Sequence, residues 1–118
     1  MPAPLVSITS PSAATPGIVN AGGELLNAKG NWTRPPNTSA EIRVIGMIVD
    51  DGVAPPVRPP PGLAKSDNIQ YTTPNSGTWS YDKWPCGPPG EHYKLVVWLD
   101  VEDCTCYHPA KPVVFLAQ

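Results

Sequence analysis

The stretch SGTWSYDKWPCGPPGEHYKLVVWLDVED, residues 76–103, decides the fold of this chain. It contains a glycine-led segment with two aromatic residues, a proline-glycine corner at residues 88–90, and a long alternating segment from His92. Every second residue of that last segment is apolar, and these residues share one face: Tyr93, Leu95, Val97, Leu99 and Val101. A period of two over this length predicts a half-buried antiparallel β-strand.

Further segments with strand character lie on both sides of this stretch. Residues 41–49 (EIRVIGMIV) are nearly continuous and β-branched, which predicts a central strand covered on both faces. The complete set of predicted strands is 5–9, 24–32, 41–49, 66–72, 78–82, 92–102 and 113–116. Turn residues separate them and no segment has a convincing helical pattern, so the sequence predicts a small all-β sandwich of seven to eight strands.

Length and composition indicate one domain. A chain of 118 residues can bury roughly two thirds of its unfolded surface without help from a metal or disulfide. It contains 17 prolines and 10 glycines, yet 41% of its residues are apolar, which indicates a core with many rigid turns. We expect an N-terminal arm and edge strand at residues 1–15, and a sandwich at 16–118 with a proline-rich loop at 54–62.

The charge pattern argues against two classes of partner. The net charge is −2 and the charges are sparse and mixed in sign, whereas nucleic acids and anionic membranes require a basic face. No apolar stretch approaches the length of a membrane span. The N-terminus has no basic region followed by an apolar region, so we expect no secretory signal and production in the cytoplasm.

The last third of the chain resembles bacterial and phage immunoglobulin-like domains. Those domains commonly show a G-x-W strand, a P-P-G-x-Y-x-L corner, an alternating strand that ends in an acidic residue, and a final P-V-x-F strand. The matching positions here are Gly77, Trp79, 88–90, Tyr93, Leu95, Asp100 and 112–115. Residues 8–11 (ITSP) also resemble the first strand of the family, whereas the extra residue before Tyr93 and the insertion at 54–62 depart from it. The resemblance implies a single immunoglobulin-like β-sandwich of antiparallel strands, a fold that serves adhesion, display, decoration and spacer roles alike.

The cysteines and histidines invite a zinc interpretation. If residues 104–108 are extended, Cys104, Cys106 and His108 share one face. A straight strand at 92–102 would place Cys86 and Cys104 at opposite ends of the sandwich, because such a strand spans on the order of 35 Å. A disulfide tolerates a Cα separation of only about 7 Å. Three interpretations stay open: reduced or packed thiols, a bridge between subunits or between Cys104 and Cys106, and a metal.

The acidic residues do not form a catalytic pattern. Asp50 and Asp51 follow one predicted strand, and Asp100 ends another, so we expect them at opposite ends of the sandwich. No nucleophile, phosphate-binding or metalloprotease motif is present in the sequence. We therefore predict no catalytic residue, no cofactor and no metal.

The candidate contact surface consists of the proline loop and the outer face of the long strand. Trp98 has the parity of Lys94, so it should point away from the main core, beside Val96. We expect the Trp98 ring either to pack under the proline loop or a neighbouring subunit, or to stack on a sugar. The predicted contact residues are Pro55, Pro56, Arg58, Pro59, Pro60, Pro61, Val96 and Trp98.

These observations and the family resemblance favour a non-enzymatic structural protein. We expect a bacteriophage virion accessory, such as a capsid decoration (cement) or tail-associated protein. It would be made in the host cytoplasm, form a homo-oligomer and bind capsid or tail subunits. The alternative is a carbohydrate-binding or adhesion module at a bacterial cell surface. A third possibility is an enzyme with a metal centre at residues 104–108.

Overall fold

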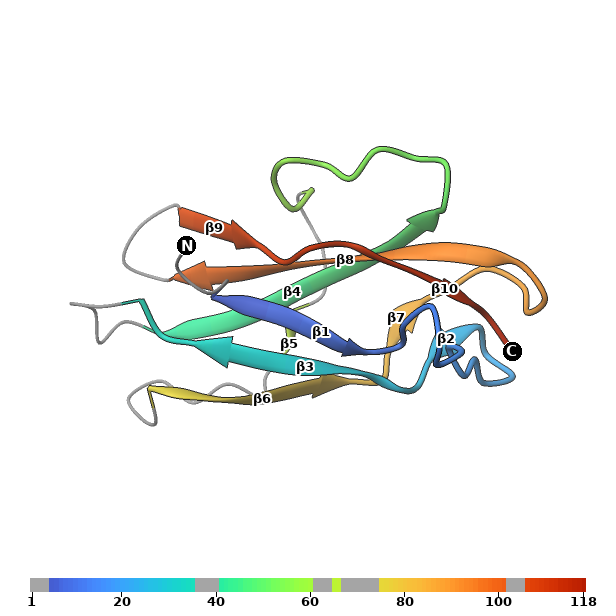
Figure 1. Cartoon of the computed structure of the whole chain (residues 1–118), viewed down its shortest axis with the longest axis horizontal. Helices are drawn as coiled ribbons and strands as arrows, with labels where there is room; N and C mark the ends of the chain where they lie inside the picture. The colour runs from blue at the N-terminus through green and yellow to red at the C-terminus, as the bar shows by residue number, and fades with distance from the viewer. Residues whose placement is uncertain (1–4, 36–40, 61–64, 67–74, 102–105) are drawn as a thin grey trace.

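Two antiparallel β-sheets face each other across a common core (Figure 1). The computed structural model describes residues 5–35, 41–60, 65–66, 75–101 and 106–118, and those residues contain no helix. The radius of gyration is 13.8 Å, close to the roughly 13.5 Å typical of a compact domain of this length. The predicted all-β architecture is therefore confirmed.

The smaller of the two sheets has the order β1-β3-β6. Its strands are β1 (Val6–Ser10), β3 (Ala28–Thr33) and β6 (Ser76–Tyr81). The larger sheet has the order β10-β8-β4-β5, formed by β10 (Val113–Leu116), β8 (His92–Val101), β4 (Ile42–Asp50) and β5 (Lys65–Ser66). A short ladder joins β2 (Glu24–Leu25) to β7 (Trp84–Pro85), and β9 (Cys106–Pro109) pairs with β8.

Strands β4 and β8 form the centre of the larger sheet. Their ladder runs without interruption from the pair Ile42–Val101 to the pair Asp50–Tyr93. The predicted apolar face of β8 lies in the main core, and all five of its residues are buried. The expectation that β8 is only half-buried is wrong, because its other face is also covered from Val96 to Asp100.

Strands β9 and β10 lie end to end along the same edge of β8. Residues 106–109 pair with the second half of β8, and residues 113–116 pair with its first half. Between them, the Ala110 N–H donates to the carbonyl oxygen of Val97 at 2.8 Å. Pro109 and Pro112 flank this junction and have no backbone N–H. The row of hydrogen-bond donors along the outer side of this edge is therefore interrupted.

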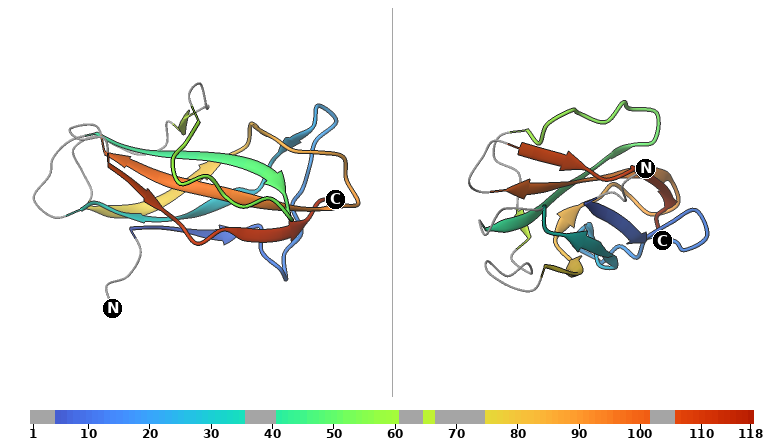
Figure 2. Two further views of the ribbon diagram at one scale, coloured as in Figure 1. Left: turned by 90° about the horizontal axis from the view of Figure 1, so that it is seen from above. Right: turned by 60° about the vertical axis from the view of Figure 1, so that its left-hand side comes forward.

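The N-terminal part of the chain contacts both sheets. After β1, which belongs to the smaller sheet, a cis Ser10–Pro11 bond precedes a loop that reaches the larger sheet. There Gly17 pairs in parallel with Ala117. The Gly17 N–H donates to Leu116 O, and the Gln118 N–H donates to Gly17 O, both at 2.8 Å. The two sheets are thus joined along one side of the molecule (Figure 2).

Large aromatic rings in the core pack directly on glycines. The indole of Trp79 lies over Gly30 in β3 and donates its N–H to the carbonyl oxygen of Ser7 at 2.9 Å. The ring of Trp84 lies against Gly46 in β4, and its centroid is 5.7 Å from that of Trp79. A glycine on the inner face of a strand removes one side chain from the sheet, which leaves room for an indole.

The predicted strands agree with the observed ones except in three places. Residues 24–32 form two strands, β2 and β3, rather than one. The short strands β7 and β9 were not predicted from the sequence. Of the strand predicted at 66–72, only Ser66 lies among the described residues, where it belongs to β5. No helix in the described part of the chain is long and apolar enough to cross a membrane.

Candidate contact surface

The proline-rich loop begins with a turn at the end of β4. The Val53 N–H donates to the carbonyl oxygen of Asp50 at 3.0 Å, and Lys94 Nζ donates to the carbonyl oxygen of Val53 at 2.8 Å. Residues 51–60 then pass over the outer face of the larger sheet without joining a ladder (Figures 1 and 2). Seven of these ten residues are apolar or proline, and the prolines cannot donate backbone hydrogen bonds.

Two positions of this loop are half-buried, and the other eight of residues 51–60 are exposed. Pro56 and Pro59 are half-buried, whereas Val57 and Arg58 between them are exposed. Val57 has 87% of its surface exposed, far more than the other exposed large apolar side chains in the described residues. The predicted contact residues Pro55 and Pro60 are also exposed, and Pro61 lies outside the described residues.

Val96 and Trp98 lie on the outer face of β8, as their parity predicted. Together with Ile45 they form a second apolar cluster, separate from the main core, with Met47, Val49 and Tyr107 packed against it. Val96 is 2% exposed and Trp98 is 0% exposed. Both side chains are therefore covered within a single chain, and their role in contacts with another protein stays a prediction.

All four tryptophans are buried. Trp32, Trp79 and Trp84 belong to the main core, and Trp98 belongs to the outer cluster. Among the described residues, the indole N–H groups of Trp84 and Trp98 have no hydrogen-bond partner. A ring that stacks on a sugar must be accessible, so this structure offers no tryptophan to a carbohydrate ligand.

The predicted metal-binding and redox residues are only partly described. Cys86 is a free, half-buried thiol whose pKa is raised by burial and lowered to a smaller extent by the Gly87 backbone N–H. Cys104 and the side chain of Cys106 lie outside the described residues, and His108 is half-buried in β9. In the described part of the chain, no three His, Cys, Asp or Glu side chains are grouped for metal binding.

The two acidic regions lie at opposite ends of the β4–β8 ladder, as predicted for Asp50 and Asp100. Asp50 is paired with Tyr93 at one end, and Asp100 with Arg43 at the other. Asp50 and Asp51 share an open depression with Glu91 and His92. The sequence also places Glu102 and Asp103 at the Asp100 end, and both lie outside the described residues.

One apolar surface was missed by the sequence reasoning. Ile18 and Leu26 are exposed and adjacent, because the Leu26 N–H donates to the carbonyl oxygen of Ile18 at 2.7 Å. We call these residues together the end patch. A signal was present, because Leu25 and Leu26 are adjacent in a segment predicted as a strand. The period of two requires one of them to face outward.

No family model, curated protein or solved structure matches this chain. The function must therefore be inferred from the fold and the surface.

Proposed function

We propose that this chain is an immunoglobulin-like β-sandwich that works by binding other proteins rather than by catalysis. We further propose that it is a bacteriophage virion accessory, such as a capsid decoration or tail-associated protein. Three lines of support are the strand order, the corner before β8, and the exposed apolar loop.

The strand order is compatible with the immunoglobulin-like family. In that family the first, second and fifth strands belong to one sheet, and the third, sixth and seventh belong to the other. Here β1, β3 and β6 form one sheet, while β4, β8 and the β9–β10 edge form the other, with β5 beside β4. The same division of the chain supports the proposal.

The corner before β8 provides a second similarity. Immunoglobulin-like domains commonly contain a tyrosine near the start of the sixth strand whose hydroxyl donates to the backbone a few residues upstream. Here Tyr93 Oη donates to the carbonyl oxygen of Pro88 at 2.8 Å. Burial raises the pKa of Tyr93, and the Glu91 carboxylate raises it further, so the phenol keeps the proton that it donates.

We predict that Tyr93→Phe lowers the melting temperature by roughly 4–8 °C, because Pro88 loses its hydrogen-bond donor.

A group whose pKa is raised by folding binds its proton more tightly in the folded state. Stability therefore falls as the pH rises past the ordinary tyrosine value of 10.0. Thermal melts at neutral pH and above pH 10 should show a smaller alkaline loss in Tyr93→Phe than in the wild type. Tyr81→Phe, which leaves the corner intact, is the control. Equal losses in the two variants would argue against a special role for the corner.

The exposed apolar loop is the observation that carries the binding role. Val57 has 87% of its surface exposed, between two half-buried prolines and beside Arg58. A large apolar side chain displayed on a rigid loop can dock with little loss of conformational entropy. This suits a permanent contact with a particle surface.

The proposed function predicts binding to virus particles. We expect the purified chain to co-sediment at a saturating stoichiometry with tailed-phage capsids that have been stripped of their accessory proteins. Val57→Glu should weaken that binding at least tenfold, whereas Thr78→Glu, an exposed change on β6, should leave it unchanged. If no capsid or tail preparation binds the chain and a glycan array does, the surface-adhesion alternative replaces this proposal.

A further inference from the structure

The turn that links β4 to the proline loop contains a reactive dipeptide. Asp51 is followed by Gly52, and no other aspartate or asparagine of the chain precedes a glycine. The carboxyl group of an aspartate can condense with the backbone nitrogen of the next residue to form a succinimide ring. Glycine hinders this attack least, because it has no Cβ beside the nitrogen and its backbone adopts unusual conformations easily. Asp51 is therefore the aspartate of this chain with the least hindered neighbour.

The structure leaves both reacting groups accessible. Asp51 and Gly52 are exposed, and a methyl group built on Gly52 would meet nothing within 4 Å. Within the described residues, neither the Asp51 carboxylate nor the Gly52 N–H has a hydrogen-bond partner. No other group therefore has to be displaced before the carboxyl carbon meets the nitrogen.

The turn is also held weakly. Asp51 and Gly52 occupy its two central positions, and the Val53 N–H closes it by donating to the carbonyl oxygen of Asp50 at 3.0 Å. All four residues of the turn are exposed, so none of its side chains is anchored in the core. A segment with few buried contacts opens locally at little cost in free energy. The turn can thus reach the geometry of ring closure while the domain stays folded.

Water has direct access to this turn. Asp51 lines an open depression of about 490 Å³, which it shares with Asp50, Glu91 and His92. Opening of a succinimide consumes one water molecule. The second half of the reaction is therefore as unobstructed as the first.

We propose that Asp51 is a site of spontaneous isomerisation to isoaspartate. The Gly52 nitrogen attacks Cγ of Asp51 and forms a new C–N bond, while the hydroxyl of the carboxyl group leaves with the amide proton as water. Water then adds to the main-chain carbonyl carbon of Asp51 and breaks its bond to the Gly52 nitrogen, which regains a proton. One water is lost and one is gained, so the mass and the net charge of the chain do not change.

The product lengthens the main chain at the start of the proline loop. In isoaspartate the chain runs through the side-chain carbons, which inserts an extra atom between Asp50 and Gly52. The hydrogen bond from Val53 to Asp50 then has to close a larger ring, and the Val53 carbonyl oxygen moves away from Lys94 Nζ, which now donates to it at 2.8 Å. The proline loop loses both anchors at this end. The inference goes beyond the proposed function, because it requires no partner and is tested on the chain alone.

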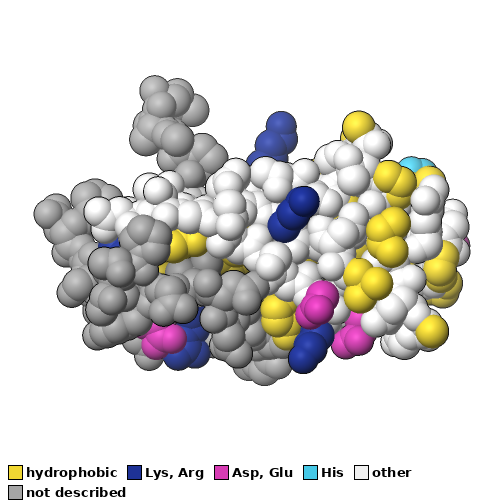
Figure 3. Space-filling view, turned by 90° about the horizontal axis from the view of Figure 1, so that it is seen from below, with side chains coloured by type: hydrophobic (Ala, Val, Ile, Leu, Met, Phe, Trp, Pro, Cys, Tyr) yellow, Lys and Arg dark blue, Asp and Glu magenta, His cyan; other side chains and the backbone are white. Residues whose placement is uncertain are grey.

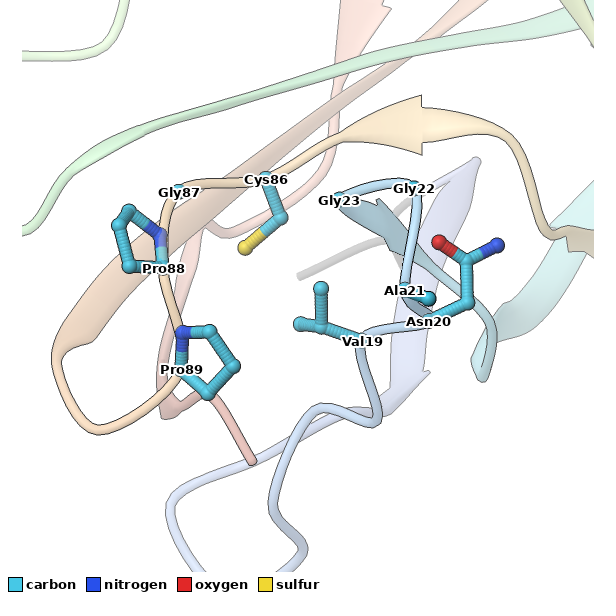
Figure 4. A pocket seen from close by; sticks show the side chains of 9 residues that line it. All are labelled: Val19, Asn20, Ala21, Gly22, Gly23, Cys86, Gly87, Pro88 and Pro89. Atoms are coloured by element: carbon cyan, nitrogen blue, oxygen red, sulfur yellow. The ribbon is translucent and has the colours of Figure 1, made fainter.

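Two residues of the same chain serve as internal comparisons. Asp82 is exposed, but Lys83 follows it and has a Cβ that hinders its nitrogen. Asp82 directly follows β6, and Figure 3 shows the side of the molecule on which β6 lies, where acidic and basic side chains are neighbours. In Figure 4 the Asn20 side chain points away from the opposite turn, and its Oδ1 accepts a hydrogen bond from the Glu24 N–H at 2.9 Å. That bond must break before the Asn20 amide carbon can meet the next nitrogen.

The test is incubation of the purified chain for several weeks at neutral pH, well below its melting temperature. Methylation by a protein isoaspartyl methyltransferase detects isoaspartate, and electron-transfer fragmentation in the mass spectrometer locates it. We expect at least ten times more isoaspartate at Asp51 than at Asp82 or Asn20. Gly52→Ala should slow the reaction at least fivefold. Asp51→Glu keeps the charge and should abolish the reaction, because the longer side chain closes a larger and less favourable ring.

A synthetic peptide with the sequence of residues 47–57 measures the rate without the fold. The folded chain should react within fivefold of this peptide, and a slower reaction would mean that the turn protects Asp51 and overturns the proposal. Equal isoaspartate at Asp51, Asp82 and Asn20 also overturns it. In the isomerised fraction, the Val53 amide proton should exchange with solvent at least tenfold faster by nuclear magnetic resonance, and unchanged exchange would contradict the loss of the anchor. All these outcomes are independent of the capsid assay.

Discussion

Gly30→Ala is expected to destabilise the domain by about 3 kcal/mol or more, a large share of the stability of a domain this size. A methyl group on the inner face of β3 would overlap the carbonyl oxygen of Ser7 and would lie 2.6 Å from the indole nitrogen of Trp79. It would therefore enter the space through which Trp79 donates its hydrogen bond to Ser7. Neither group can move away easily, since one is backbone of β1 and the other is a buried ring.

Urea unfolding at neutral pH measures this effect. The control is Gly52→Ala in the exposed turn after β4, where a new methyl group meets nothing within 4 Å. Its unfolding free energy should change by less than about 0.5 kcal/mol. Similar values for the two variants would mean that Trp79 does not lie over Gly30 in solution.

Trp84→Ala is expected to cost about 3–5 kcal/mol, because removing a buried tryptophan leaves a cavity that the surroundings only partly fill. Trp84 belongs to the two-residue strand β7, yet its ring is fully buried between Gly46 and the rings of Trp79 and Tyr81. It therefore fills a space that the two main sheets leave open. The unfolding free energy of the single variant measures the cost directly.

A double-mutant cycle gives the matched control. Gly46→Ala alone should be destabilising, because the new methyl group would lie 2.6 Å from the Trp84 ring. The same change should be much less harmful in a Trp84→Ala background, where the ring is gone. A coupling of at least about 1 kcal/mol is expected for groups in direct contact. Additive effects would contradict the contact.

The local features of the long strand could be predicted from the sequence because they depend on chain geometry alone. The alternation in β8 fixed which residues face the core, and the corner at residues 88–90 marked where the strand begins. The parity of Trp98 was also sufficient to exclude it from the main core. These properties follow from the period of a strand and the conformations of proline and glycine.

The remaining features depend on residues that are distant in the sequence. Strand β9 forms because its backbone reaches a free edge of β8, and its own residues, CYHP, carry no alternation. Parity places Trp98 outside the main core but does not reveal what covers it. The end patch exists because Ile18 and Leu26, eight positions apart, meet at the surface through a backbone hydrogen bond. A one-dimensional pattern contains none of these relations.

The junction between β9 and β10 has a consequence for solubility. An uninterrupted outer strand is a template on which further chains can add, and such growth leads to fibrils. Here that edge has prolines at positions 109 and 112, and its far end is already bonded to Gly17. Along this edge, another chain finds too few free N–H groups to extend the sheet. The two prolines therefore oppose open-ended growth of the sheet at this side of the molecule.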